Sequence, residues 1–287
     1  MILRIFLLLL LGSSCATRVD YQKEYALGDA ALIEDVPFIP QEKYQCGPAA
    51  LGMLLRYRGK TPDQKELTAQ VYTPGKKGSI QSDVTSGARR QGMLALPVSK
   101  MPELLREVQD GNPVLVLQNL GLSWYPRWHY AVVIGFDLEA SELILHSGET
   151  DALSMDLSTF ERTWARAKNW GLLVVNPGYL PSTATELDLV KASAHLEQQR
   201  YLTAAARSYR AILRKWPESL GAHVGLGNVN YQQDKLEAAA AILKEATRLH
   251  PRDPSVWNNY SVVLSELGRG RESQRALLKS EKLSGKN

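Results

Sequence analysis

Cysteine is scarce in this sequence. Only two are present among 287 residues, Cys15 and Cys46. They permit one disulfide at most, and that alternative conflicts with the interpretation of the N-terminus given below. The spacings typical of metal ligands, such as HExxH or CxxC, are also missing, and no glycine-rich phosphate-binding loop is present. The sequence therefore suggests neither a metal nor a cofactor.

Charge of one sign and long apolar runs are equally rare. The formal net charge is only +4, and no stretch rich in Lys and Arg is interleaved with aromatic residues, so nucleic acid is not an expected partner. The apolar run from Ile5 to Leu11 is far shorter than the roughly 20 residues of a membrane-spanning helix. With 44% hydrophobic and 22% charged residues, the chain has the composition of a soluble globular protein of about two domains.

The N-terminus has the pattern of a secretory signal. One positive charge precedes the apolar run, small residues follow at 12–14, and Cys15 comes next. This order resembles a bacterial lipobox, which implies that 1–15 is a signal peptide and that Cys15 is lipidated. An ordinary cleaved signal and a plain membrane anchor remain alternatives. Because no Asp follows Cys15, the resemblance implies a cell-envelope protein, lipid-anchored to the outer membrane and facing the periplasm.

The patterning of the remaining chain predicts two regions of different fold class. Residues 16–35 read as a polar leader. Residues 36–177 place helices before apolar strands, which predicts an α+β domain with an antiparallel sheet, and 178–185 reads as a linker. The expected helices are 47–58, 62–71, 79–91, 101–109 and 157–165, and the expected strands are 113–118, 129–136, 142–146 and 172–175.

The last hundred residues predict an all-α region. Pro217 and Pro251 lie 34 residues apart, and alignment on them places Ala205 opposite Ala239. This period and these small residues resemble tetratricopeptide repeats, about three of them over 186–283. In such repeats, small residues let paired helices approach closely, and each repeat buries its apolar face on the next. An unrelated helical bundle is the alternative.

The segment around Cys46 carries the clearest chemical signal. Cys46 opens an expected helix, where N-terminal backbone amides favour the thiolate, the nucleophilic form of cysteine. Gly47 is expected to let substrate approach the backbone, and Pro48 suits the first helical turn. The alternative is that Cys46 is simply a small buried apolar residue.

Nucleophilic attack by a cysteine on an amide also needs a base and oxyanion donors. His129 begins an apolar strand, which would hold its imidazole rigidly beside a cleft, so we expect it to be the base. The backbone N–H of Cys46 and the side-chain amide of Gln41 are the expected oxyanion donors. His195, His223 and His250 lie in the helical repeats and are expected to be structural.

Three segments, in this order, resemble the papain-like cysteine peptidases of the bacteriocin-processing type, cysteine peptidase family thirty-nine. They are QEKYQCGPAAL at 41–51, GNPVLVL at 111–117 and HYAVVIGFD at 129–137. Members of this family cut leader peptides after a double glycine. The resemblance implies a papain-like fold over 36–176, with Cys46 as nucleophile, His129 as base and Gln41 as oxyanion donor, although Gln41 lies five residues before the cysteine rather than the usual six.

The third member of the triad departs from the family. An Asp is usual on the strand after the histidine strand, and Ser147 occupies that position here. A hydroxyl can orient the imidazole but stabilises the imidazolium less than a carboxylate does. Glu149 and Asp151 are nearby alternatives, Asp137 is expected to form a turn, and a role for His146 is left open.

Together these observations predict an extracytoplasmic thiol peptidase that hydrolyses a peptide or protein. The repeats would recruit the substrate or a protein partner, and contact with the membrane would occur only through the lipid anchor. A papain-like adaptor that binds peptide with little or no catalysis is the first alternative. A related acyl transfer, such as an amidase or transglutaminase-like reaction, is the second, because the same nucleophile and base would serve it.

Overall fold

The computed structural model describes residues 21–41 and 44–285. Cys15 and the predicted signal peptide 1–15 lie outside these residues. Within the described part of the chain, no helix is long and apolar enough to cross a membrane.

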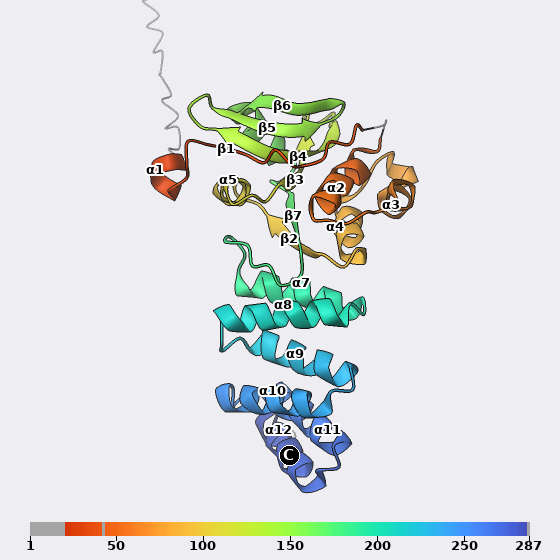
Figure 1. The fold of residues 1–287 in the computed structure, drawn as a ribbon, viewed down its shortest axis with the longest axis vertical. Coiled ribbons are helices and arrows are strands. Elements are labelled where there is room, and N and C mark those ends of the chain that lie inside the picture. The colour runs from red at the N-terminus through yellow and green to blue at the C-terminus, as the bar shows by residue number, and fades with distance from the viewer. Residues whose placement is uncertain (1–20, 42–43, 286–287) are drawn as a thin grey trace, which may run out of the picture.

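Within the described residues, a seven-stranded antiparallel sheet forms the centre of the N-terminal region (Figure 1). The strand order is β2-β7-β3-β4-β5-β6, and β1 pairs with the C-terminal part of β4. The strands are β1 Ala30–Leu32, β2 Leu94–Val98, β3 Val114–Asn119, β4 Trp128–Asp137, β5 Glu142–Ser147, β6 Thr150–Asp156 and β7 Gly171–Val175. Strands β3 and β7 are buried along their whole length. This burial explains the apolar runs VLVL and GLLVV, and β3 ends in two buried polar residues, Gln118 and Asn119.

Helices cover this sheet. They are α1 Tyr21–Tyr25, α2 Cys46–Tyr57, α3 Gln64–Val71, α4 Gln81–Arg90, α5 Met101–Gln109 and α6 Leu157–Ala165. Helix α2 packs against β4, and every residue from Gly47 to Leu55 is buried. The apolar content of CGPAALGMLL therefore reflects a helix surrounded by protein on all sides.

Two strand pairings place His129 at one end of the sheet. His129 pairs with Gln118 of β3 on one side. On the other side Ala131 pairs with Ser147 of β5, so Ser147 lies diagonally across from His129. Diagonal neighbours on adjacent antiparallel strands are within reach of long side chains. The register of β4 with β5 therefore brings Ser147 to the imidazole.

The C-terminal region is a stack of helices (Figure 1). They are α7 Glu186–Gln198, α8 Leu202–Lys215, α9 Leu220–Gln232, α10 Leu236–Leu249, α11 Pro254–Glu266 and α12 Gly270–Leu283. Ala205 and Ala239, aligned by the 34-residue period, are both fully buried. A Cβ at Gly227 would lie 2.7 Å from Leu243 Cγ, so close helix packing there requires a glycine. The predicted fold class, an α+β domain followed by all-α repeats, is confirmed.

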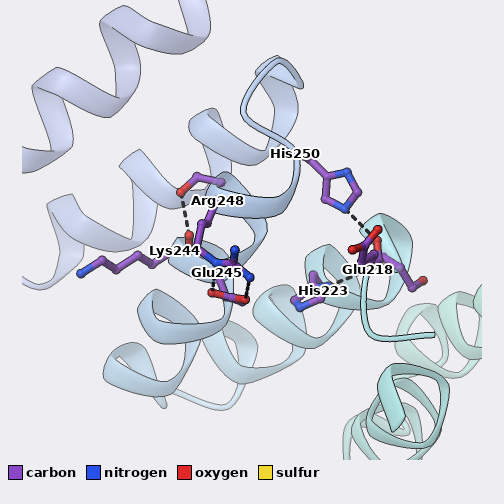
Figure 2. Close-up of polar contacts among 8 residues, drawn as sticks. Glu218, His223, Lys244, Glu245, Arg248 and His250 are labelled. Carbon is purple, nitrogen blue, oxygen red and sulfur yellow. Dashed lines mark hydrogen bonds and ion pairs between the residues drawn. The ribbon is translucent and has the colours of Figure 1, made fainter. Parts of the chain in front are cut away.

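The histidines of the repeats have structural partners, as expected. Figure 2 shows His250 beside Glu218: its Nε2 donates to the Glu218 carbonyl at 2.7 Å and joins α10 to the turn before α9. Buried His223 donates from Nδ1 to the carbonyl of Ser219 at 2.9 Å. Arg248 and Glu245 form a two-bonded ion pair on the surface of α10. The His250 contact joins two helices, whereas the other two lie within a single helix and its cap.

The two regions share one core. The main cluster of buried apolar residues extends from the sheet into α9, and α7 packs against β2. Residues 178–185, the predicted linker, are hydrogen-bonded to the N-terminal region at this junction. The fully buried carboxylate of Glu107 accepts from the backbone N–H of Thr183 at 3.0 Å and from its Oγ1 at 2.6 Å. Ser182 Oγ also donates to Asp110. The junction is therefore a packed interface.

Candidate active site

Cys46 is the first residue of α2 and carries a free, half-buried thiol. Backbone N–H groups of Tyr130, Gly47 and Cys46 itself lower the pKa of this thiol, as expected at a helix N-terminus. Burial has the larger and opposite effect, so the net pKa is raised above its ordinary value of 9.0. The backbone amides favour the thiolate as expected, but the effect of burial on the pKa is larger.

His129 lies near the start of β4 and is held by Ser147. The distance from His129 Nε2 to Ser147 Oγ is 2.8 Å. The other ring nitrogen, Nδ1, has no hydrogen-bond partner among the described residues. Burial, assisted by the positive charge of Arg127, lowers the pKa of His129 below its ordinary value of 6.5. At neutral pH the imidazole is uncharged, as a general base must be.

Gln41 is fixed against the same strand. Its Nε2 donates to the carbonyl of Tyr130 at 3.2 Å, and its backbone N–H donates to the carbonyl of Gly148 at 3.1 Å. A primary amide has two N–H donors, so one remains for a substrate oxygen. The one-residue shorter spacing from Gln41 to Cys46 therefore still leaves a donor at the site.

One cavity joins these groups. It has a volume of about 950 Å³ and is lined by Cys46, His129 and Gln41 together. Such a volume lies within the range of small-molecule and peptide-binding pockets. Residues from α2, β4 and the segment before α2, up to 88 positions apart in sequence, thus face a shared space.

The other acidic candidates for the third position have different partners. Asp137 lies at the far end of β4 and its Oδ1 accepts from Ala140 N, so it forms a turn as expected. Asp151 lies 2.9 Å from Nδ1 of His146. Glu149 lines the cavity and is exposed. Of the residues considered, Ser147 is the one hydrogen-bonded to His129.

His146 is a buried residue of β5. As the neighbour of Ser147 in the strand, it directs its side chain to the opposite face of the sheet. Its Nε2 lies 2.9 Å from the carbonyl oxygen of Val36, and its ring packs against Phe38. Both Asp151 Oδ1 and the Ala152 N–H lie within hydrogen-bonding distance of Nδ1. Because a carbonyl oxygen can only accept, Nε2 donates to Val36. His146 therefore anchors the segment 36–38 to the sheet.

The role expected of Gly47 needs correction. Gly47 is buried, and a Cβ at this position would lie 2.6 Å from Ser79 Oγ and 3.4 Å from the Tyr130 ring. The space beside Gly47 is filled by protein. The glycine is therefore required for close packing against Ser79 at the start of α2, a role that the sequence did not indicate.

Sequence reasoning missed two features of the cavity. Lys76, Lys77 and Arg127 line it, and all three lie outside the motifs around Cys46 and His129. Beside it, the β3–β4 hairpin exposes Trp124 at 81% and Tyr125 at 67%. This turn is ordered, because Leu122 and Tyr125 exchange backbone hydrogen bonds at 3.1 Å. A cluster of aromatics in the loop before His129 was the available signal.

No group of three His, Cys, Asp or Glu side chains suited to a metal ion occurs among the described residues. The chemistry available at the cavity is therefore that of a thiol, an imidazole, a hydroxyl and amide donors. This set fits acyl transfer through a cysteine nucleophile.

Two family models match the chain. Residues 33–171 match the model of the Peptidase C39 like family, and residues 189–254 match a tetratricopeptide repeat model. The chain thus contains a peptidase C39-like domain followed by tetratricopeptide repeats. No curated protein matches the chain.

Several solved structures are similar. A C39-like peptidase from Bacillus anthracis is 19% identical with a TM-score of 0.44, over 52% of this chain and 98% of that one. The double glycine motif protease of an AMS/PCAT transporter, solved with its leader peptide, is 21% identical with a TM-score of 0.40, over 50% and 92%. The peptidase domain of Streptococcus ComA is 18% identical with a TM-score of 0.39, over 49% and 98%.

Proposed function

We propose that this protein is a thiol peptidase that hydrolyses peptide bonds of a peptide or protein substrate. The observation that carries the proposal is that Cys46, His129 and Gln41 line one cavity, with His129 held by Ser147 at 2.8 Å. A thiol, an imidazole and an amide that line the same cavity support this proposal.

The reaction begins from a neutral pair, because the pKa of Cys46 is raised and that of His129 is lowered. His129 takes the proton from the Cys46 thiol as the sulfur attacks the substrate carbonyl. The carbonyl oxygen becomes an oxyanion, which the Cys46 N–H and the Gln41 amide stabilise. The imidazolium then protonates the leaving amine, and water attacks the thioester to release the acid and regenerate the thiol.

Ser147 determines how well His129 serves as this base. If Nε2–H donates to Ser147 Oγ, Nδ1 is left as an acceptor for the thiol proton. If instead the hydroxyl donates to Nε2, the proton sits on Nδ1 and the ring cannot accept there. A carboxylate would enforce the first arrangement, whereas a hydroxyl permits both. We therefore expect slow turnover.

The test compares wild type with Cys46→Ala and His129→Gln. Wild type should be alkylated by iodoacetamide at Cys46 and should cleave casein, and Cys46→Ala should lose both activities with its melting temperature unchanged. His129→Gln should retain alkylation but lose cleavage. Cleavage that persists in Cys46→Ala would refute the peptidase proposal.

A catalytically weak adaptor is the second candidate, and the neutral thiol and neutral Ser147 favour it. Under this alternative the cavity binds a peptide without cutting it. Casein and a candidate partner would then bind wild type and Cys46→Ala equally, with no Cys46-dependent products in mass spectrometry. The same spectra would identify an amidase-like reaction, because its products retain an intact main chain.

The location and partners are proposed on the sequence pattern. We place the protein in the bacterial cell envelope, held at the outer membrane by a lipid on Cys15. The repeats would bind a protein partner, since packed helical repeats form extended binding surfaces. Mass spectrometry of the mature N-terminus tests the anchor: a diacylated Cys15 supports it, and an unmodified N-terminus beyond Cys15 contradicts it.

A further inference from the structure

The cavity that Cys46 lines has more basic than acidic side chains in its lining. Lys76 and Lys77 contribute from the loop before α4, and Arg127 contributes from the start of the His129 strand. Glu149 is the single acidic residue among the described residues that line it. The described lining therefore carries an excess of positive charge on two different elements.

The three cations of the lining, Lys76, Lys77 and Arg127, lack an ion-pair partner within the described part of the chain. Asp83, near the base of the lysine loop, accepts a hydrogen bond from Thr73 Oγ1 at 2.7 Å and does not line the cavity. A cleft with one sign of unpaired charge attracts ligands of the opposite sign.

Both cationic segments are held in place by their backbones. In the lysine loop, Thr73 N–H donates to the Gly78 carbonyl at 2.7 Å, and Lys77 N–H donates to the Pro74 carbonyl at 3.1 Å. On the other segment, the backbone N–H of Arg127 donates to Asn119 Oδ1 at 2.9 Å. The backbones that carry the positive charges are thus fixed around the cavity before any ligand arrives.

The charge of Arg127 acts inside the cavity, since it contributes to the lowered pKa of His129. A carboxylate bound near Arg127 would offset this repulsion. A substrate with acidic side chains is therefore compatible with the protonated His129 that forms during the reaction.

We infer that the cavity selects peptide segments that carry Asp or Glu side chains, with Lys76, Lys77 and Arg127 as the residues that determine this specificity. The inference rests on the proposed function only in taking the cavity as a peptide-binding site. Because it concerns binding, it can be tested in a protein that cannot cleave.

The experiment uses the full chain with Cys46→Ala, immobilised and exposed to a random dodecapeptide mixture at low salt. Retained peptides are identified by mass spectrometry. We expect enrichment of Asp and Glu over the input by about threefold or more, since each exposed charge pair changes affinity by roughly 1.5- to 5-fold. Enrichment should fall in about 1 M salt, where the attraction between charges is screened beyond ~3 Å.

Two variants on the same background separate specific selection from general attraction to a basic protein. Lys76→Glu with Lys77→Glu should invert the preference and enrich Lys and Arg. Lys279→Gln with Lys282→Gln removes two exposed charges from α12, at the opposite end of the molecule (Figure 1), and should leave the acidic preference intact.

Capture without acidic enrichment, no capture above the blank, or an equal loss in the α12 variant would each overturn the inference. Cleavage of casein by wild type is measured separately. Loss of acidic selection with Cys46-dependent cleavage intact would refute the specificity alone, whereas acidic selection without cleavage would refute the peptidase and leave a binding domain.

Discussion

The repeat region and the cavity region are built on different principles. In the repeats, buried positions such as Ala205 and Ala239 recur after 34 residues, and helices pack mainly on their neighbours in sequence. At the cavity, Gln41, Cys46, His129 and Ser147 come from segments separated by up to 106 positions. The difference suggests that substitutions in the repeats should act on stability alone, whereas substitutions at the cavity should act on chemistry. Four predictions test this separation.

The largest effect is expected for Leu243→Ala in α10. Leu243 is 1% exposed and packs over Gly227 in the smaller core cluster of the repeats. Its truncation should lower the free energy of unfolding by about 2–5 kcal/mol, through lost burial and a cavity. Urea denaturation measures the loss, while iodoacetamide labelling of Cys46 should stay unchanged under native conditions. Leu278→Ala, 58% exposed on α12, is the control and should change stability by no more than about 0.5 kcal/mol. Altered labelling would show that the repeats and the cavity are coupled.

Gly47→Ala should change both stability and chemistry, because Gly47 is buried against Ser79 and directly follows Cys46. The added Cβ would overlap Ser79, so we expect a loss of about 1–3 kcal/mol from overpacking, together with slower labelling of Cys46. The double variant Gly47→Ala with Ser79→Gly removes the overlapping atoms and should recover part of the stability. Equal losses in the single and double variants would show that the contact with Ser79 is not the cause.

Ser147→Asp should change the chemistry with little change in stability. A carboxylate accepting from His129 Nε2 would fix the tautomer and stabilise the imidazolium, so the casein cleavage rate should rise by about tenfold, equivalent to ~1.4 kcal/mol. Ser147→Ala should lower it. The kinetic signature is an upward shift of the acid limb of the pH–rate profile in Ser147→Asp, because the carboxylate raises the pKa of His129. An unchanged profile would mean that position 147 does not orient the base.

The smallest effect concerns pH. The pKa of the Cys46 thiol is raised above 9.0, and below that pKa the thiolate fraction grows about tenfold per pH unit. The rate of alkylation by iodoacetamide should therefore keep rising with pH through 9.0 instead of reaching a plateau in acid. Arg127→Gln removes the charge that lowers the pKa of His129, so the acid limb of cleavage should move slightly upward. A plateau of alkylation below neutral pH would indicate a resting thiolate–imidazolium pair.

The fold was predictable wherever a segment had a strong local pattern. The helices at 101–109 and 157–165 were predicted with their observed bounds, and the strand at His129 within one residue at each end. Strand β2 was missed because it is a short edge strand with Pro97 at its exposed position, where proline is tolerated. Strand β6 was missed because TDALSMD is mostly exposed and only Leu153 and Met155 are half-buried.

The candidate site was predictable in its residues but not in its electrostatics. Cys46, His129 and Gln41 were identified from motifs, and they line one cavity. The basic lining at Lys76, Lys77 and Arg127 was not, because nothing local tells a solvent-facing loop from one that borders a cleft. The helix N-terminus at Cys46 is visible in the sequence, whereas the burial that raises the pKa of its thiol is not.

The sequence alone determined which chemistry is available, because a cysteine opening a helix, a histidine opening a strand and a 34-residue period are local patterns. Only the tertiary structure decided how those groups are charged and which partners they have. The register between β4 and β5 brought Ser147 to His129, and burial by surrounding elements made the thiol and the imidazole neutral. Register and desolvation depend on the whole packed domain, so no single segment encodes them.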